Sequence, residues 1–207
     1  MNRARRAVLL VLAVLIGAGT FALRAGDEKA NDGWEPLFNG KDLAGWKASE
    51  GVEWKVDNGE IVTPPKRSHL FTDREFKNFE FKADVMTTPG SNSGLYFHTK
   101  FEDTFPNNGY ESQVNQTHGD PVKSGSLYFV VKLFSTPVKD NEWYTHQIIV
   151  KGKQITVKIN DKTLFEYVEP DGVTGTRKLS KGSFAIQAHD PKSVVYYKNI
   201  MVKPLPD

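Results

Sequence analysis

The sequence contains no cysteine among its 207 residues. This absence excludes disulfide bonds, thiolate nucleophiles and thiolate metal sites. An excess of one charge is lacking too, because 27 Lys and Arg residues nearly balance 25 Asp and Glu residues, for a formal net charge of +2. A chain without a strongly basic field is not expected to bind nucleic acid.

The familiar short motifs of catalysis are missing as well. The sequence has no G-x-G-x-x-G, no P-loop, no H-E-x-x-H, no EF-hand loop and no G-x-S-x-G nucleophile elbow. Dinucleotide, phosphate, zincin and nucleophile-elbow chemistry therefore have no support from local motifs. A functional site has to be found from the side chains that the fold brings together.

Long hydrophobic runs are rare, and the clearest lies at the N-terminus. It follows Arg3, Arg5 and Arg6 and extends from Ala7 to Ile16. A basic start, a short apolar run and small residues are typical of a secretory signal, whereas a membrane-spanning helix needs about 20 apolar residues. We expect residues 1–25 to be a signal peptide, with a retained membrane anchor as the alternative.

Residues 26–33 are polar and small and are interpreted as a linker. Removal of residues 1–25 would take away four arginines and change the net charge from +2 to −2. We therefore expect an exported protein, located in a bacterial periplasm or outside the cell. Residues 34–207 are expected to form one domain.

This domain is predicted to be all-β. In residues 79–85 the apolar side chains alternate with charged ones, and residues 145–168 resemble a meander of strands joined by turns at Gly152 and Asn160. Residues 93–98, 182–189 and 194–202 add further strands, and helical periodicity is absent after the N-terminal run. About ten to a dozen strands exceed an immunoglobulin-type sandwich, so we predict a two-sheet antiparallel jelly roll.

Three predicted strands carry polar pairs on the face opposite their apolar residues. Because side chains alternate along a strand, each pair points to one side. Such faces form either a cleft or an ordinary solvated surface, and alternation alone does not distinguish the two. The pairs are Tyr96 with His98, Glu111 with Gln113, and Gln187 with His189.

The pair Glu111 and Gln113 limits the chemistry. Ordinary glycoside hydrolysis uses two carboxylates on either side of the glycosidic bond. A glutamine is neither a nucleophile nor a base, so this strand alone argues against a standard retaining hydrolase. For the isolated histidines His69 and His146 we expect surface or hydrogen-bonded roles.

Several segments together resemble the 3-keto-disaccharide hydrolase domain family, formerly a domain of unknown function. The resemblance covers nearly all of residues 34–207, and its segments occur in the expected order. It implies a concanavalin A-like lectin/glucanase fold. The matching segments are "LFNGKDLAGW" (37–46), "WKVDNGEIV" (54–62), "FKNFEFKADV" (76–85), "GSNSGLYFH" (90–98), "GYESQV" (109–114), "SGSLY" (124–128), "EWYTHQIIVKGKQITVKINDK" (142–162), "GSFAIQAH" (182–189) and "YYKNIMVKPL" (196–205).

The resemblance also implies action on sugars oxidised at C3, where a ketone acidifies the C2 proton and the C1 substituent leaves by β-elimination. One base at C2 then replaces the second carboxylate. The implied catalytic residues are Glu111, His98 and His189, with Glu111 or His189 as the base. The implied substrate-binding residues are Gln113, Gln187, Tyr96 and Tyr128.

Other features of the implied function stay open at this point. The sequence requires no cofactor, although a divalent metal held by Glu111 and histidines is conceivable. The loop residues His118 and Asp120 either enter the site or cap a turn. The ligand would be a carbohydrate or 3-keto-sugar, and an oxidoreductase would have to supply the ketone. A non-catalytic carbohydrate-binding module and an ordinary glycoside hydrolase are the alternatives.

Overall fold

The computed structural model describes residues 32–207. The expected signal peptide and all of the expected linker except Asp32 and Gly33 lie outside this range. The described residues form strands, turns and loops, without a helix. No helix long and apolar enough to cross a membrane occurs among them.

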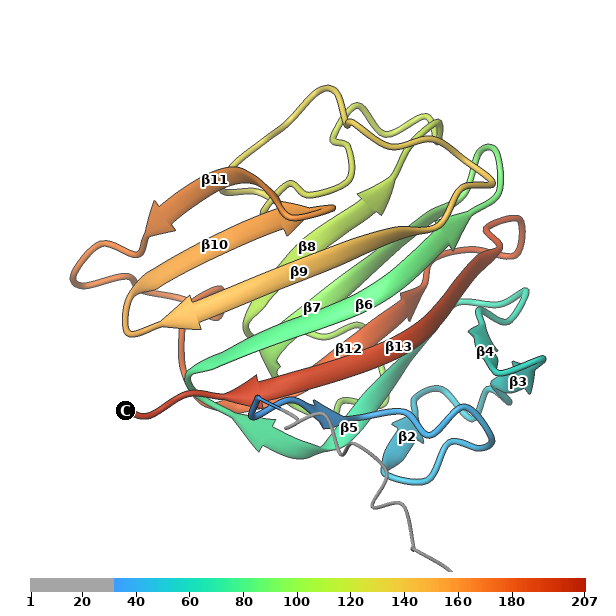
Figure 1. Cartoon of the computed structure of the whole chain (residues 1–207), viewed down its shortest axis with the longest axis horizontal. Coiled ribbons are helices and arrows are strands. Elements are labelled where there is room, and N and C mark those ends of the chain that lie inside the picture. The colour runs from blue at the N-terminus through green and yellow to red at the C-terminus, as the bar shows by residue number, and fades with distance from the viewer. Residues whose placement is uncertain (1–31) are drawn as a thin grey trace, which may run out of the picture. The chain divides into compact units, whose positions relative to one another are not determined.

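Eight strands form the first sheet, in the order β11-β10-β9-β6-β13-β4-β3, with β1 beside β13 (Figure 1). All pairs in this sheet are antiparallel. The strands are β1 (Glu35–Pro36), β3 (Lys55–Asp57), β4 (Glu60–Val62), β6 (Phe79–Thr87), β9 (Tyr144–Lys151), β10 (Gln154–Ile159), β11 (Lys162–Val168) and β13 (Val195–Pro204).

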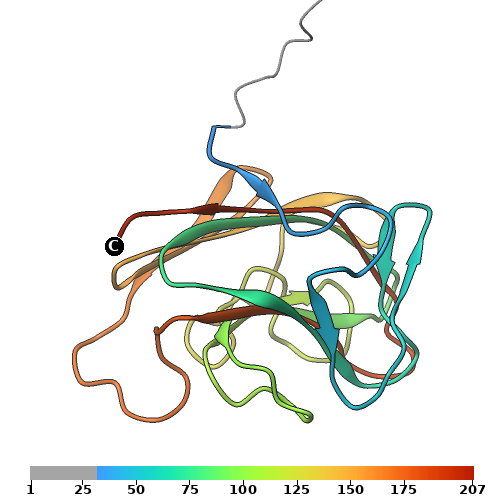
Figure 2. The same cartoon turned by 90° about the horizontal axis from the view of Figure 1, so that it is seen from below.

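Five strands form the second sheet, in the order β2-β5-β12-β7-β8, again antiparallel. Figure 2 shows the two sheets as layers seen nearly edge-on. The strands are β2 (Trp46–Ala48), β5 (Ser68–Phe76), β7 (Asn92–Thr99), β8 (Tyr110–Asn115) and β12 (Gly182–Ala188). The predicted all-β, two-sheet antiparallel sandwich is confirmed.

The core lies between the two sheets and follows from alternation. Every second residue of β6, starting at Phe79, is buried, while the residues between them are partly exposed. Phe81 of this strand stacks on Phe184 of β12 with ring centroids 4.4 Å apart, which joins the two layers. Burial of such aromatic rings supplies much of the free energy that holds a sandwich together.

The second sheet differs from the first because both of its faces are covered. In β7, β8 and β12 every residue is buried, although only alternate side chains can face the core. The polar side chains of these strands therefore do not lie on an open, solvated surface. Alternation alone left two possibilities for these polar faces, a cleft or a solvated surface. The burial of β7, β8 and β12 favours the cleft.

Candidate active site

A small cavity lies on the outer face of the second sheet. Its volume is about 70 Å³, and it is partly open to solvent. Strands β7, β8 and β12 supply its floor, and the loops that carry Phe105, Asp120 and Tyr128 supply its walls. The lining residues are Asn92, Phe105, Glu111, Gln113, Asp120, Tyr128, Gln187 and His189.

Five of the seven residues assigned to the site from the sequence therefore line one cavity. These are Glu111, Gln113, Tyr128, Gln187 and His189. Tyr96 lies beside them, since it pairs with Glu111 across β7 and β8 and its hydroxyl accepts a hydrogen bond of 3.0 Å from the Gln187 amide. His98 is the exception.

Glu111 is the buried acid of the cavity, with only 3% of its surface exposed. Burial raises its pKa to about 7, against the opposing effects of a hydrogen bond from Tyr96 and the positive charge of Arg177. A carboxyl group with this pKa exchanges its proton readily near neutral pH. It can therefore serve either as an acid or as a base.

Gly94 leaves the space that the Glu111 side chain occupies. The Glu111 carboxylate lies over the Gly94 backbone, where a Cβ atom would clash with the Glu111 side chain. The torsion angle of Gly94 is not in the left-handed region, so the need for glycine here is one of space. Any other residue at position 94 would push the carboxyl group away from the strand.

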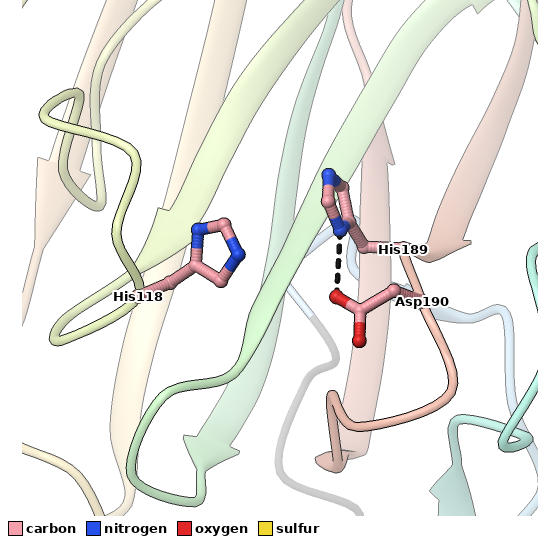
Figure 3. A group of neighbouring side chains, drawn as sticks. All are labelled: His118, His189 and Asp190. Carbon is pink, nitrogen blue, oxygen red and sulfur yellow. Dashed lines mark hydrogen bonds and ion pairs between the residues drawn. The ribbon is translucent and has the colours of Figure 1, made fainter.

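His189 is oriented by its neighbour Asp190. The Nδ1–H group of His189 donates to the Asp190 carboxylate over 2.8 Å (Figure 3). Ser193 donates to the same oxygen over 2.7 Å. Although burial opposes it, these bonds and that from the Lys192 backbone hold the pKa of Asp190 at about 2. With Nδ1 protonated, the lone pair of His189 is on Nε2, as a general base requires.

His118 lies opposite His189, with ring centroids 5.4 Å apart (Figure 3). Together with Asp190, the two histidines place ligand atoms within 4.8 Å of one another, a spacing that a divalent cation could bridge. However, His118 Nδ1 accepts a hydrogen bond from the Asp120 backbone N–H over 3.1 Å, which puts the ring proton on Nε2. His118 would have to give up that bond to become a ligand, so the residues as arranged do not form a ready metal site.

Other polar side chains of the cavity form hydrogen bonds with one another. The Gln113 amide donates to Asn92 over 3.2 Å, and the Tyr128 hydroxyl donates to Asp120 over 3.0 Å. Burial, together with Asp120, raises the pKa of Tyr128 and keeps its hydroxyl protonated. These side chains offer amide and hydroxyl groups in fixed orientations, as sugar hydroxyl groups require.

The expectation that His98 shares a face with Tyr96 is wrong. His98 has a φ of 55°, in the left-handed region, and this breaks the alternation at the end of β7. One ring nitrogen bonds the Lys77 carbonyl oxygen over 2.8 Å, and the other accepts the Ser180 N–H over 3.0 Å. Burial lowers its pKa to about 4. The geometry gives His98 a structural role outside the cavity.

The sequence analysis missed several residues that shape the site. His69 of β5, expected to be exposed or hydrogen-bonded, is fully buried on the outer face of the second sheet and has no hydrogen-bond partner among the described residues. Asp190 acts by orienting His189, and Gly94 acts by leaving space for the Glu111 carboxylate. Asp190 could have been noticed as the residue after His189, whereas His69 could be found only by knowing that β5 pairs with β12.

The fold and the site together define the class of this protein: a concanavalin A-like β-sandwich with a cavity lined by carboxyl, imidazole and amide groups. The profile of the 3-keto-alpha-glucoside-1,2-lyase-like domain matches residues 33–203, and the chain belongs to this carbohydrate-active family. No curated protein matches the sequence.

Solved structures share the fold. A presumed glycosyl hydrolase from Parabacteroides distasonis superimposes with a TM-score of 0.74 at 24% identity, over 87% of this chain and 97% of that one. The carbohydrate-binding module CBM66 from Bacillus subtilis gives a TM-score of 0.57 at 13% identity, over 77% and 95% of the two chains. At these identities the likeness concerns the sandwich alone.

Proposed function

We propose that this chain cleaves glycosides of sugars that carry a ketone at C3. A base removes the C2 proton, the freed electron pair forms a C1–C2 double bond, and the C1–O bond breaks with the leaving oxygen taking up a proton. Water then adds at C1 and a proton returns to C2. The net reaction is hydrolysis, and the ketone is regenerated unchanged.

In this proposal His189 is the base and Glu111 is the acid. The Asp190 carboxylate holds the His189 proton on Nδ1, so Nε2 is free to accept the proton of C2. Glu111, whose pKa burial raises to about 7, can carry a proton near neutral pH and donate it to the leaving oxygen. Gln113 and Gln187 orient hydroxyl groups of the sugar, with Tyr96 and Tyr128 beside them.

The observation that carries the proposal is the buried Glu111 in one cavity with an oriented His189. A plain binding module has no need for a carboxyl group whose burial raises its pKa to about 7. The family to which the chain belongs is named for a lyase acting on 3-keto-alpha-glucosides, which supports the same substrate class. An oxidoreductase acting earlier would supply the ketone, and the expected signal peptide would export the protein.

The direct experiment compares a glucoside with its C3-oxidised form as substrates of the purified protein. The proposal predicts turnover of the oxidised form and none of the unoxidised one. Turnover of the unoxidised glucoside would contradict it. Binding of both sugars without turnover of either would instead indicate a carbohydrate-binding module.

An ordinary glycoside hydrolase remains the second candidate because Asp120 gives the cavity a second carboxylate. Its two oxygens already accept hydrogen bonds from Tyr128 and from the Val122 backbone N–H. Asp120→Asn separates the two functions. It should abolish ordinary hydrolysis as fully as Glu111→Gln, but it should reduce elimination only modestly.

The pH profile tests whether the protonation state of Glu111 controls turnover. Because Glu111 has a pKa of about 7, kcat/KM on the 3-keto-glucoside should change as the pH passes through about 7, and this dependence should be absent from the residual activity of Glu111→Gln. The same dependence in the variant would show that another group titrates there.

A further inference from the structure

The outer face of the first sheet carries a groove that the proposed reaction does not use. Its volume is about 540 Å³, within the range of pockets that hold small ligands. Its floor consists of side chains of β10, β9, β6 and β13, which are neighbours in the sheet (Figure 1). Because the outer faces of the two layers point away from each other, this groove and the cavity at Glu111 lie on opposite sides of the sandwich (Figure 2).

The register of the strands places side chains of the groove in one row. Gln147 of β9 is the direct partner of Lys82 on β6 and of Lys158 on β10. Met201 of β13 continues the row as the partner of Lys82. All four side chains are partly exposed and alternate with buried ones, so they lie on the face away from the core. The row crosses three strand spacings, or roughly 14 Å, which is longer than one sugar ring.

Trp34 adds an aromatic wall beside this row. The ammonium group of Lys82 lies over the indole, 4.1 Å from the ring centroid, and this cation–π contact holds the ring at the groove. The indole is only half-buried, so part of its surface is available to a ligand. Aromatic rings of this kind pack against the apolar face of a sugar ring.

A β-bulge in β13 points a further polar side chain toward the groove. The register of β13 against β6 shifts between Lys198 and Met201, and Asn199 within the bulge has a left-handed φ of 49°. Its amide donates to one oxygen of Asp84 over 2.7 Å, and the Thr145 hydroxyl donates to the other oxygen over 2.7 Å. The carboxylate is thereby fixed in orientation and retains lone pairs that can accept from hydroxyl groups of a ligand.

The charge and the polarity of the groove decide which ligand it fits. Lys82 and Lys158 balance Asp84 and Asp161, so the groove does not favour an anion. Among its lining residues only one tryptophan and one methionine are apolar, whereas the centre of a protein–protein interface is mostly apolar. A chain of neutral sugars, which combines many hydroxyl groups with apolar ring faces, matches both properties.

We propose that this groove is a second carbohydrate-binding site, which takes a chain of at least two neutral sugars. One sugar ring packs against the indole of Trp34. Hydroxyl groups of this ring and the next bond the ammonium and amide groups of Lys82, Gln147 and Lys158 and the carboxylate of Asp84. The site is separate from that of the proposed reaction and does not depend on it.

Calorimetric titration with two linear hexasaccharides of glucose, one α-linked and one β-linked, tests the site. The wild type should bind at least one of them, and Trp34→Ala should raise its Kd about tenfold or more. Trp143→Ala is the matched control and should change the Kd by less than about twofold. Its indole is likewise covered by a lysine, with Lys198 Nζ 3.7 Å from the centroid, but Trp143 does not line the groove. Binding of neither sugar by the wild type, or equal effects of the two substitutions, would overturn the site.

Two further titrations test the row and the charge of the ligand. Lys158→Met keeps an apolar stem but removes the ammonium group at the far end of the row, and it should raise the Kd about threefold or more. An unchanged Kd in this variant would contradict the proposed row. For a neutral ligand the Kd should change by less than about twofold between about 0.05 and 0.5 M NaCl, whereas a steep dependence on salt would indicate an anionic ligand and overturn the proposal.

These readouts use unoxidised sugars and require no turnover. Trp34→Ala should cleave a small 3-keto-glucoside as the wild type does, because Trp34 lies on the opposite side of the sandwich from Glu111. If binding depends on Trp34 but no 3-keto-glucoside is cleaved, the groove stands and the proposed reaction fails. If the 3-keto-glucoside is cleaved but Trp34→Ala binds the hexasaccharide as the wild type does, the reaction stands and the groove fails.

Discussion

At the scale of single residues, the account depends on one carboxyl group. Glu111 lies buried at 3% exposure over a glycine, and burial raises its pKa to about 7 from its usual value of 4.5. A pKa raised in the folded state means that folding favours the protonated form. The associated stability is present below about pH 4.5 and is lost as the pH rises through about 7.

Glu111→Gln should therefore stabilise the protein at alkaline pH and inactivate it. The shift corresponds to about 3 kcal/mol at pH values above about 8, and the gain should vanish near pH 4. Turnover should fall about 100-fold or more, because glutamine donates no proton to a leaving oxygen. Denaturant unfolding at both pH values and a turnover assay check this. Wild-type activity in the variant would clear Glu111 of a catalytic role.

Gly94→Ala should reproduce the loss of activity without touching an ionisable group. The added Cβ meets the Glu111 carboxylate and displaces it from the cavity. Gly119→Ala is the matched control, since a Cβ there meets nothing within 4 Å and the residue has no left-handed φ. We expect kcat on the 3-keto-glucoside to fall about tenfold or more in Gly94→Ala and to stay unchanged in Gly119→Ala. Equal activities would mean that the carboxyl position is unimportant.

At the scale of elements, β7 shows where the alternation of side chains along a strand predicts their positions correctly and where it fails. Side chains from Asn92 to Phe97 alternate as expected, with Leu95 and Phe97 in the core and Tyr96 on the outer face. The left-handed φ of His98 ends the alternation, and the sequence around His98 does not predict this φ. The ring is then held between the Lys77 carbonyl and the Ser180 N–H, two segments distant in sequence.

His98→Ala should accordingly cost stability rather than catalysis. Loss of the ring leaves two buried backbone groups without partners, worth about 2–4 kcal/mol together. Lys77→Ala is the control, because that side chain is 56% exposed and pairs only with Asp207 at the surface. Thermal unfolding and kcat of the folded fraction are the measurements. A large drop in kcat with unchanged stability would contradict this prediction and indicate a catalytic role for His98.

The same comparison explains which parts of the site the sequence could supply. Alternation correctly keeps Glu111 with Gln113, which both belong to β8, and Gln187 with His189, which directly follows β12. It cannot show that β5 lies next to β12, which is what brings His69 to the site. Nor does it place the loop residues Phe105 and Tyr128, since loop conformations depend on the tertiary contacts around them.

At the scale of the whole molecule, the burial of titratable groups makes the folded state sensitive to acid. Burial lowers the pKa of His69 and His146 to about 3 and that of His98 to about 4. When folding lowers the pKa of a histidine, its contribution to the free energy of unfolding is fully present above about pH 6.5. That contribution is lost as the pH falls toward the pKa of the folded state. Glu111 acts in the opposite direction between about pH 4.5 and 7, but one carboxyl group offsets only part of the loss from three histidines.

The melting temperature should therefore be level above about pH 7 and should fall steeply toward pH 4. Scanning calorimetry over this range measures it. Glu111→Gln should make the fall steeper, because it removes a carboxyl group whose protonation stabilises the folded state at low pH. A melting temperature independent of pH between 7 and 4 would show that these histidines are not buried uncharged.

The central claim is that cleavage proceeds through removal of the C2 proton. The most direct measurement is turnover of a 3-keto-glucoside in D₂O, with NMR or mass spectrometry of the released 3-keto sugar and an enzyme-free incubation to correct for exchange beside the ketone. The account predicts one deuterium at C2 of each product molecule, in step with cleavage. Cleavage without deuterium at C2 would contradict it.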